Sequence, residues 1–450
     1  MLQNVKSQKE TLRRLLVIAI PIILSNIINQ TQMLIDRIFL GQTNTLYMSV
    51  LGNVNSPLWC TISFCFSLAT GASILISQNV GAGNREKFQE YAGSMLKFNN
   101  IMPILLFFFW EFFSEIVFNL LGVSPTLLPM CIDYVRFFAP IFLLLGFESS
   151  FLVILQTSNN TKPLAWFGLI RSVLNIFFDW VLIFGNLGFP SMGIKGAALG
   201  TTLAEYIGFS YILVETLRLK NLETRPSKKN ISLAKFKSYF HSARLGVNTA
   251  LEDFAWNFGN LSLIRILNSI SEMAAGIYSI VFGVEVIAVV IMTALGNGTM
   301  TISSEATGRQ DSKQYKGVCA CAYFLCLAIC LVMILLSIFF PKEIISLFTR
   351  DASIISVSCL YLLMISINLI SKAANIIIGN GIRGSGDTKW MFMTQIFGTV
   401  FVVGTALLFV HVLKFGIAGV FLAILFDEFT RGIINLLKIL KIARSFSKKA

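Results

Sequence analysis

Long runs of apolar residues, separated by short polar segments, follow one another along the whole chain. A helix of about 20 apolar residues is long enough to cross the hydrocarbon core of a bilayer, so each run predicts a membrane-spanning helix. Twelve such runs occur, near residues 15–40, 50–79, 99–121, 134–156, 164–185, 196–217, 246–268, 275–302, 318–340, 357–379, 390–413 and 415–437. The pattern predicts an all-α polytopic membrane protein with twelve spanning helices.

The composition of the chain excludes a soluble globule, a disordered chain and a disulfide scaffold. Of the 450 residues, 55% are hydrophobic and only 13% are charged, whereas about a quarter of the residues of a soluble domain are charged. A soluble globule of this composition would expose far too much apolar surface. The 8 Cys are scattered through apolar runs, and with 2 His and no Cys-x-x-Cys pair the chain offers no zinc ligand set.

The basic residues lie almost entirely on one side of the predicted helices. The sequence has 36 Lys+Arg and 23 Asp+Glu, a formal net charge of +13. Of these basic residues, 26 fall in the terminal segments and the even-numbered connections, whereas the opposite loops hold only Lys195, Lys342, Arg350 and Lys414. The positive-inside rule therefore predicts an inner-membrane protein with both termini in the cytoplasm. The basic excess is a topology signal, and no nucleic-acid partner is expected.

The two halves of the chain repeat each other at a shift of 227 residues. Gly71 and Gly81 match Gly298 and Gly308 at this shift. Six helices per half is an even number, so both halves enter the membrane from the same side, as parallel repeats do. We expect an N-terminal lobe over residues 1–225, a basic cytoplasmic linker over 226–245, and a C-terminal lobe with a basic tail over 246–450. Two six-helix lobes around a central cavity are a transporter architecture.

Polar side chains form a stripe on one face of two predicted helices in the N-terminal lobe. The stripes consist of Asn29, Gln32 and Asp36 in the first helix, and Arg171, Asn175 and Asp179 in the fifth. Carboxylates inside a membrane are costly and mark functional sites, and carboxylate and amide oxygens suit Na⁺ or a carried proton. A structural alternative pairs Asp36 with Arg37, or Asp179 with Arg171. The repeat carries the two Asp positions to the apolar Leu263 and Ala406, which favours a function confined to one lobe.

Several motifs together resemble one transporter family. They are Asn175-Ile-Phe-Phe-Asp179, Gly193-Ile-Lys-Gly196, Asp36-Arg-Ile-Phe-Leu-Gly41, Gly71-Ala-x4-Ser77-Gln78-x2-Gly81-Ala-Gly83 and Arg383-Gly-x-Gly386-Asp-Thr-Lys389. In order and spacing, they resemble the multidrug and toxic compound extrusion (MATE) transporters of prokaryotic type over nearly the whole chain. Members of that family export drugs, toxins or metabolites in exchange for inward H⁺ or Na⁺.

The resemblance also implies a site. It assigns a cation or proton site to Asp36, Asn175, Asp179 and Thr201, and a bend of the first helix to Pro21. Many members carry carboxylates in the seventh and tenth helices; Glu252 matches the first, but Lys372 stands at the second position. We therefore predict that Lys372 pairs with Glu252 or its neighbour Asp253 in place of a bound cation, unless it snorkels to the cytoplasmic interface.

Five further acids lie in or beside apolar runs without a clear shared face: Glu148, Glu205, Glu285, Asp427 and Glu428. For each of them a structural ion pair and a role in the transport pathway stay open.

We expect the protein to be a secondary antiporter and to act as a monomer. It would export organic, cationic or amphipathic drugs or metabolites in exchange for H⁺ or Na⁺ by rocker-switch alternating access, with no cofactor other than the coupling ion. A lipid-linked-precursor flippase of the same superfamily is the alternative. A membrane enzyme would need a metal cluster or a nucleophile with its base, and the sequence shows neither. A channel would need a selectivity loop, and the sequence shows none. The sequence leaves the substrate and the choice between H⁺ and Na⁺ open.

Overall fold

The computed structural model describes residues 2–158, 160–219 and 226–446. In these ranges the chain is built from helices joined by short turns, and it contains no strand. The first part contains α1 (Leu2–Thr43), α2 (Thr45–Gly81), α3 (Arg85–Phe98), α4 (Ile101–Leu120), α5 (Leu128–Phe138), α6 (Phe142–Thr157), α7 (Lys162–Phe184), α8 (Ile194–Arg218) and α9 (Lys228–Leu233). The second part contains α10 (Phe236–Ile270), α11 (Glu272–Gly308), α12 (Ser312–Phe339), α13 (Pro341–Ser346), α14 (Ala352–Gly384), α15 (Thr388–Leu407) and α16 (Ile417–Phe446). Short 3₁₀ turns join α5 to α6 (Ala139–Ile141) and follow α7 (Asn186–Gly188), and a π-helical turn, Leu408–Val412, extends α15.

All twelve predicted apolar runs are helical in the described residues. Ten helical stretches are long and apolar enough to cross a membrane, with α3–α4 and α5–α6 each forming one of them. The predicted run 246–268 lies in α10, and the predicted run 415–437 lies in α16 except for its first two residues. Of the basic residues counted in the sequence, Lys220, Arg225, Lys448 and Lys449 lie outside the described residues, as do 220–225 of the predicted lobe and 447–450 of the predicted tail.

Contacts divide the chain into two compact units. One comprises Ile20–Val247 and the other Met1–Ala19 with Asn248–Ala450; we call them the N-terminal unit and the C-terminal unit. This grouping differs from the lobe bounds expected from the sequence at two places. The first 19 residues group with the C-terminal unit, and the linker 226–245 groups with the N-terminal unit.

In the N-terminal unit, α7 and α8 lie against each other along much of their length, and α5 and α6 also pack on α8. The chain can turn sharply between α7 and α8 because Gly185 ends α7 with a left-handed φ of 78°. An apolar core fills the space between α2, α4, α5 and α8, with Trp110 and Phe142 among its fully buried side chains. This packing fixes the side of α7 that carries Asn175 and Asp179.

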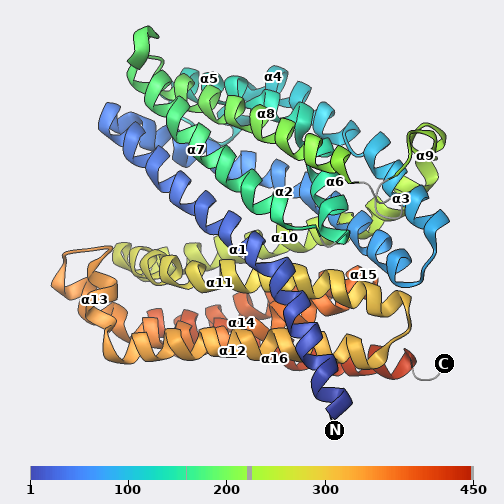
Figure 1. The fold of residues 1–450 in the computed structure, drawn as a ribbon. Coiled ribbons are helices and arrows are strands. Elements are labelled where there is room, and N and C mark those ends of the chain that lie inside the picture. The colour runs from blue at the N-terminus through green and yellow to red at the C-terminus, as the bar shows by residue number, and fades with distance from the viewer. Residues whose placement is uncertain (1, 159, 220–225, 447–450) are drawn as a thin grey trace. The chain divides into compact units, whose positions relative to one another are not determined.

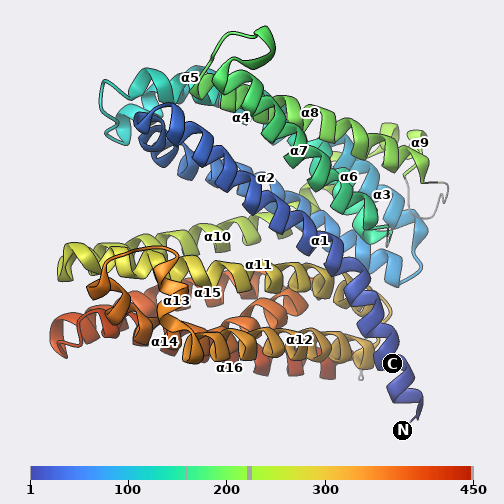
Figure 2. The ribbon, with the colours of Figure 1, turned by 60° about the vertical axis from the view of Figure 1, so that its left-hand side comes forward.

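In the C-terminal unit, α14 is the central helix and contacts α11, α12 and α16. Figures 1 and 2 show α11, α12, α14 and α16 running side by side. The approach of α14 to α11 is very close, since a Cβ added at Gly384 would lie 2.1 Å from Ser303 Oγ. A second apolar core, which includes Tyr361 stacked on Phe421 at 4.7 Å, lies between these helices.

Candidate functional site

The predicted residues of the N-terminal unit meet in one buried cluster formed by α1, α7 and α8. Asn175 and Asp179 on α7 are 0% exposed, and Gln32 on α1 is buried as well. Gln32 Nε2 lies 3.4 Å from Asp36 Oδ2 and 2.5 Å from the Asn175 amide. The Asn175 amide in turn lies 3.1 Å from Thr201 Oγ1. The structure therefore brings together Asp36, Asn175, Asp179 and Thr201.

Asn175 lies at the centre of this cluster. With its amide nitrogen turned toward Asp36 Oδ1, at 3.1 Å, its amide oxygen accepts from Thr201 N and Oγ1 at 3.2 and 3.1 Å. In the opposite orientation its oxygen accepts from Gln32, and its nitrogen donates to Thr201 and, at 3.4 Å, to Asp179 Oδ1. Either way, one amide links the side chains of three helices.

The carboxyl groups of Asp36 and Asp179 lie close enough to interact electrostatically. Asp179 Oδ2 is buried without a hydrogen-bond partner among the residues that the structure describes. In that part of the chain, neither Asp36 nor Asp179 has a Lys, Arg or His nitrogen within 4.0 Å. Two neighbouring carboxyl groups, one fully buried and one half-buried, with no basic partner, require a proton or a cation to compensate their charge.

Arg171, on the same stripe as Asp179, has other partners. Its guanidinium donates to Asn29 Oδ1 at 2.6 Å and forms an ion pair with Glu205 at 3.2 Å. Glu148, which is 2% exposed, lies beside Glu205 in the same network. The alternative that Asp179 is neutralised by Arg171 is thus wrong. Asn29 helps to hold Arg171 and does not touch the carboxyl pair in the described contacts.

Pro21 lies inside α1, which continues as a helix on both sides of it. The division between the two units falls between Ala19 and Ile20, directly before this proline. Proline removes one helical hydrogen bond and weakens the helix locally, so a place where α1 could bend coincides with the passage from one unit to the other.

The predicted pair of Lys372 with Glu252 or Asp253 is wrong. Glu252 on α10 pairs with Arg383, whose Nη2 and Nε lie 2.6 and 3.2 Å from its two oxygens. Lys372 Nζ lies 2.5 Å from Glu285 Oε1 on α11 and 4.0 Å from Glu428 Oε1 on α16. Lys372 and Arg383 are 11 residues apart on α14, about 16 Å along a helix, so they meet different partners at different depths.

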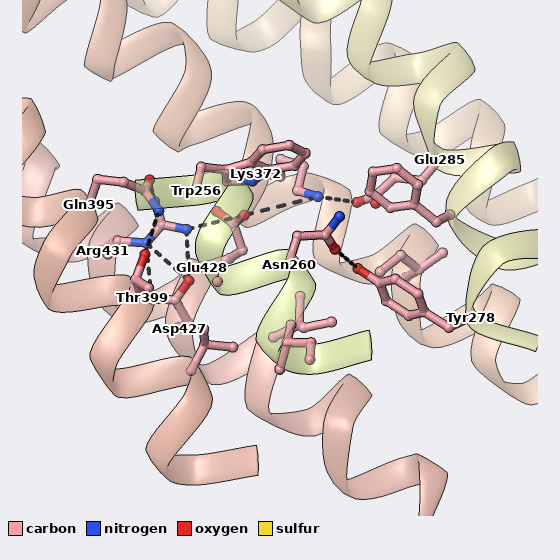
Figure 3. A pocket seen from close by; sticks show the side chains of 16 residues that line it. Trp256, Asn260, Tyr278, Glu285, Lys372, Gln395, Thr399, Asp427, Glu428 and Arg431 are labelled. Atoms are coloured by element: carbon pink, nitrogen blue, oxygen red, sulfur yellow. Dashed lines mark hydrogen bonds and ion pairs between the residues drawn. The ribbon is translucent and has the colours of Figure 1, made fainter. Parts of the chain in front are cut away.

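Lys372 and Glu285 line a cavity of the C-terminal unit (Figure 3), which sequence reasoning did not assemble. Its other charged residues are Asp427, Glu428 and Arg431. Arg431 lies 2.7 and 3.0 Å from the two Asp427 oxygens and donates to Gln395 Oε1 at 2.9 Å. The sequence held a signal for this pair, because Asp427 and Arg431 are four residues apart in an apolar helix. Asp253 is not among the residues that line the cavity.

Comparison with known proteins places the fold and the family. The solved structure of a MATE transporter in the bent conformation matches with a TM-score of 0.90 at 17% identity, over 99% of this chain and 98% of that chain. A transporter of the MOP superfamily from Pyrococcus furiosus matches with a TM-score of 0.87 at 16% identity, over 97% of both chains. These similarities confirm the predicted fold of twelve helices in two lobes.

Sequence relatives agree with the fold. The probable multidrug resistance protein NorM of Thermotoga maritima is 24% identical over 431 residues, which are 95% of this chain and 92% of that protein. The uncharacterized transporter YisQ of Bacillus subtilis is 25% identical over 401 residues, 89% of this chain and 88% of that protein. The MatE family model matches residues 21–181 and 249–410, which lie in both halves of the chain. The chain therefore belongs to the MatE family of multidrug and toxic compound extrusion transporters.

Proposed function

We propose that this transporter is a secondary antiporter that exports organic, cationic or amphipathic drugs or metabolites in exchange for inward H⁺ or Na⁺. The observation that carries the proposal is the carboxyl pair of the half-buried Asp36 and the buried Asp179, which has no basic partner in the described chain. Relatives with names such as multidrug resistance protein NorM support export of drugs as the general activity. They give no support to the alternative of a lipid-linked-precursor flippase.

The cluster offers chemistry for either coupling ion. Na⁺ prefers oxygen ligands, and Asp36, Asp179, the Asn175 amide and the Thr201 hydroxyl would supply them. A proton would instead be shared between the two neighbouring carboxyl groups. In both cases the ion compensates the charge of the pair, and its departure leaves the carboxylates uncompensated. Binding and release of the ion can therefore favour different states of the protein.

We further propose that this difference drives rocker-switch alternating access of the two lobes. The weak point of α1 at Pro21, next to the passage of the chain from one unit to the other, supports a bend of α1 during that movement. The distribution of basic residues supports cytoplasmic termini and an inner-membrane location. A monomer, without a cofactor beyond the coupling ion, stays our prediction.

The test is transport by the purified protein in proteoliposomes. A fluorescent organic cation would be followed under a pH gradient and, separately, under a Na⁺ gradient, to identify the coupling ion. Asp36→Asn and Asp179→Asn should each abolish gradient-driven export, because an amide keeps the shape but loses the charge that the ion compensates. Asp133→Asn is the matched control, since Asp133 is 38% exposed and pairs with Lys195. Export at the wild-type rate by both site variants would contradict the proposal.

A further inference from the structure

The Lys372–Glu285 pair is a buried ion pair on the wall of a cavity. Glu285 is 1% exposed and the Lys372 side chain 13% exposed, and the distance between Nζ and Oε1 is 2.5 Å. Figure 3 shows the pair at one side of the cavity, with Trp256 and Tyr278 close by. The pair belongs to α14 and α11 of the C-terminal unit, whereas the carboxyl pair belongs to α1 and α7 of the N-terminal unit.

The other charges around this cavity have partners of their own. The guanidinium of Arg431 holds Asp427 with a two-pronged contact and lies 3.3 Å from Glu428. Glu428 Oε2 also accepts from Asn375 Nδ2 at 2.6 Å. Glu428 is 4.0 Å from Lys372, at the limit of an ion pair. Lys372 and Glu285 are therefore the closest partners of each other, and they form one balanced pair of charges.

The space next to the pair suits an aromatic group. The rings of Trp256 and Phe282 lie 6.5 Å apart, and those of Tyr278 and Phe282 are stacked at 5.8 Å. The Tyr278 hydroxyl is held by Asn260 at 2.7 Å, which fixes that ring. The cavity, with its open mouth included, contains about 500 Å³ of space, and Trp256 is 41% exposed. An aromatic group that enters from the open side would meet these rings beside the pair.

A charged solute in this cavity has to compete with the existing pair. An organic cation that takes Glu285 from Lys372 leaves the buried ammonium of Lys372 with only Glu428, which is 4.0 Å away and already paired with Arg431. An organic anion that takes Lys372 leaves Glu285 in the same position. Breaking a buried pair from one side is strongly unfavourable, because one charge remains uncompensated. A solute that carries both charges on neighbouring atoms leaves neither charge alone.

We propose that this cavity binds aromatic zwitterions, with the ammonium group of the solute on Glu285 and its carboxylate on Lys372. The proposal rests on the proposed function for the statement that such a solute is cargo, and it narrows the cargo class to solutes with both charges. Lys372 is then a specificity-determining residue. Without it, Glu285 would bind simple cations; with it, the solute must also supply a carboxylate.

Three ligands with one carbon skeleton test the proposal directly. Phenylalanine carries both charges, phenethylamine lacks the carboxylate, and 3-phenylpropionate lacks the ammonium. Binding to the purified full-length protein in detergent would be measured by isothermal titration calorimetry, without any ion gradient. We expect phenylalanine to bind roughly tenfold or more tightly than either of the others.

Charge-neutral variants should change this order in a reciprocal way. In Lys372→Met the free Glu285 should favour phenethylamine, and in Glu285→Gln the free Lys372 should favour 3-phenylpropionate. The double variant Lys372→Met/Glu285→Gln removes both charges, so no unpaired buried charge destabilises its fold. This variant should bind the three ligands without preference. Lys195→Met is the matched control, because Lys195 belongs to an exposed pair with Asp133, and it should keep the wild-type order.

The two proposals fail in different ways. Equal affinity of the wild type for the three ligands, no binding of phenylalanine, or an unchanged order in Lys372→Met would overturn the zwitterion site. Because binding is measured without a gradient, the binding result supports the zwitterion site even if gradient-driven export is absent. Loss of export together with the expected binding order would reject the antiport proposal and leave this site in place.

Discussion

Gly200 on α8 allows the backbone of that helix to pass directly beside the Asp179 side chain. A Cβ added at Gly200 would lie 2.5 Å from Asp179 Oδ1 and 3.3 Å from the Asp179 backbone nitrogen. The contact at 2.5 Å is too close for real atoms, so the carboxyl group would have to turn away from its present position. Gly200 thus determines where the Asp179 oxygens lie relative to Asp36.

We therefore predict that Gly200→Ala damages ion-coupled export more than it damages the fold. Displacing a functional group by about 1 Å costs enzymes about 100-fold in rate, and we expect export to fall about tenfold or more. Export would be measured in proteoliposomes, and stability by thermal unfolding in detergent. Gly404→Ala on α15 is the matched control, because nothing lies within 4 Å of a Cβ added there. Equal export by the two variants would contradict the role of Gly200.

The helical spacing of polar residues predicted the part of this cluster that lies on α1 and α7. Asn175 and Asp179 are four residues apart on α7, and Gln32 and Asp36 are four apart on α1, so each pair shares a face. Thr201 came from the family resemblance alone, since a single Thr near the start of an apolar helix has no pattern. Gly200 was not identified, because the need for a glycine there arises from the crossing of α8 over Asp179.

At the level of helices, the Arg383–Glu252 pair joins the C-terminal end of α14 to α10. Glu252 is 6% exposed, and both of its oxygens accept from the Arg383 guanidinium. The sequence prediction compared the depths of residues along two helices, and this comparison could not identify Arg383 as the partner of Glu252. Sequence gives the depth of a residue to within several positions, but not the rotation of α10 or which basic residue of α14 faces it. α10 begins at Phe236, ten residues before the predicted run, and an error of about three turns is enough to exchange Lys372 for Arg383.

We predict that Arg383→Gln destabilises the protein by about 3–5 kcal/mol, because it leaves the Glu252 carboxylate buried without its main partner. Arg383→Gln combined with Glu252→Gln should restore much of that loss, since the double change removes both charges. Thermal unfolding of the two single variants and the double variant would give the coupling energy. The exposed pair Arg218–Glu215 provides a control, and Arg218→Gln should cost less than about 1 kcal/mol. Additive losses in the Arg383 cycle would show that the pair contributes little.

At the level of the whole molecule, two helices each contribute to both units, at equivalent places in the repeat. The boundary in α1 falls after Ala19 and that in α10 after Val247, and the repeat shift of 227 carries Ala19 to Gly246, one residue before the second boundary. Arg14 fixes the start of α1 to Glu305 of α11 at 2.6 Å, within the C-terminal unit. The repeat thus predicted the two lobes well, but not that the first turns of helices one and seven pack with the other half.

The repeat partners Gly71 and Gly298 contact these two helices, but they leave very different amounts of space for a side chain. Within the N-terminal unit, a Cβ at Gly71 would lie 2.1 Å from the Ser242 carbonyl oxygen and 2.5 Å from the Gly246 nitrogen of α10. Within the C-terminal unit, a Cβ at Gly298 would meet side-chain atoms of α1, namely the end of Leu15 at 3.0 Å and the Ile18 side chain at 3.5 Å. Backbone atoms of a helix cannot move aside singly, whereas a leucine methyl group can shift by a few tenths of an ångström.

Gly71→Ala should therefore destabilise the protein by about 3 kcal/mol, the upper end of the usual cost of overpacking, whereas Gly298→Ala should cost less than about 1 kcal/mol. Because Gly71→Ala pushes the start of α10 away from α2, it should also expose the segment around Ser242 to limited proteolysis. Thermal unfolding in detergent and protease digestion of the two variants would check both effects. If other contacts hold α10 in place, the two variants will lose equal stability and the segment around Ser242 will stay protected. That result would show that the close crossing at Gly71 does not fix α10 on α2.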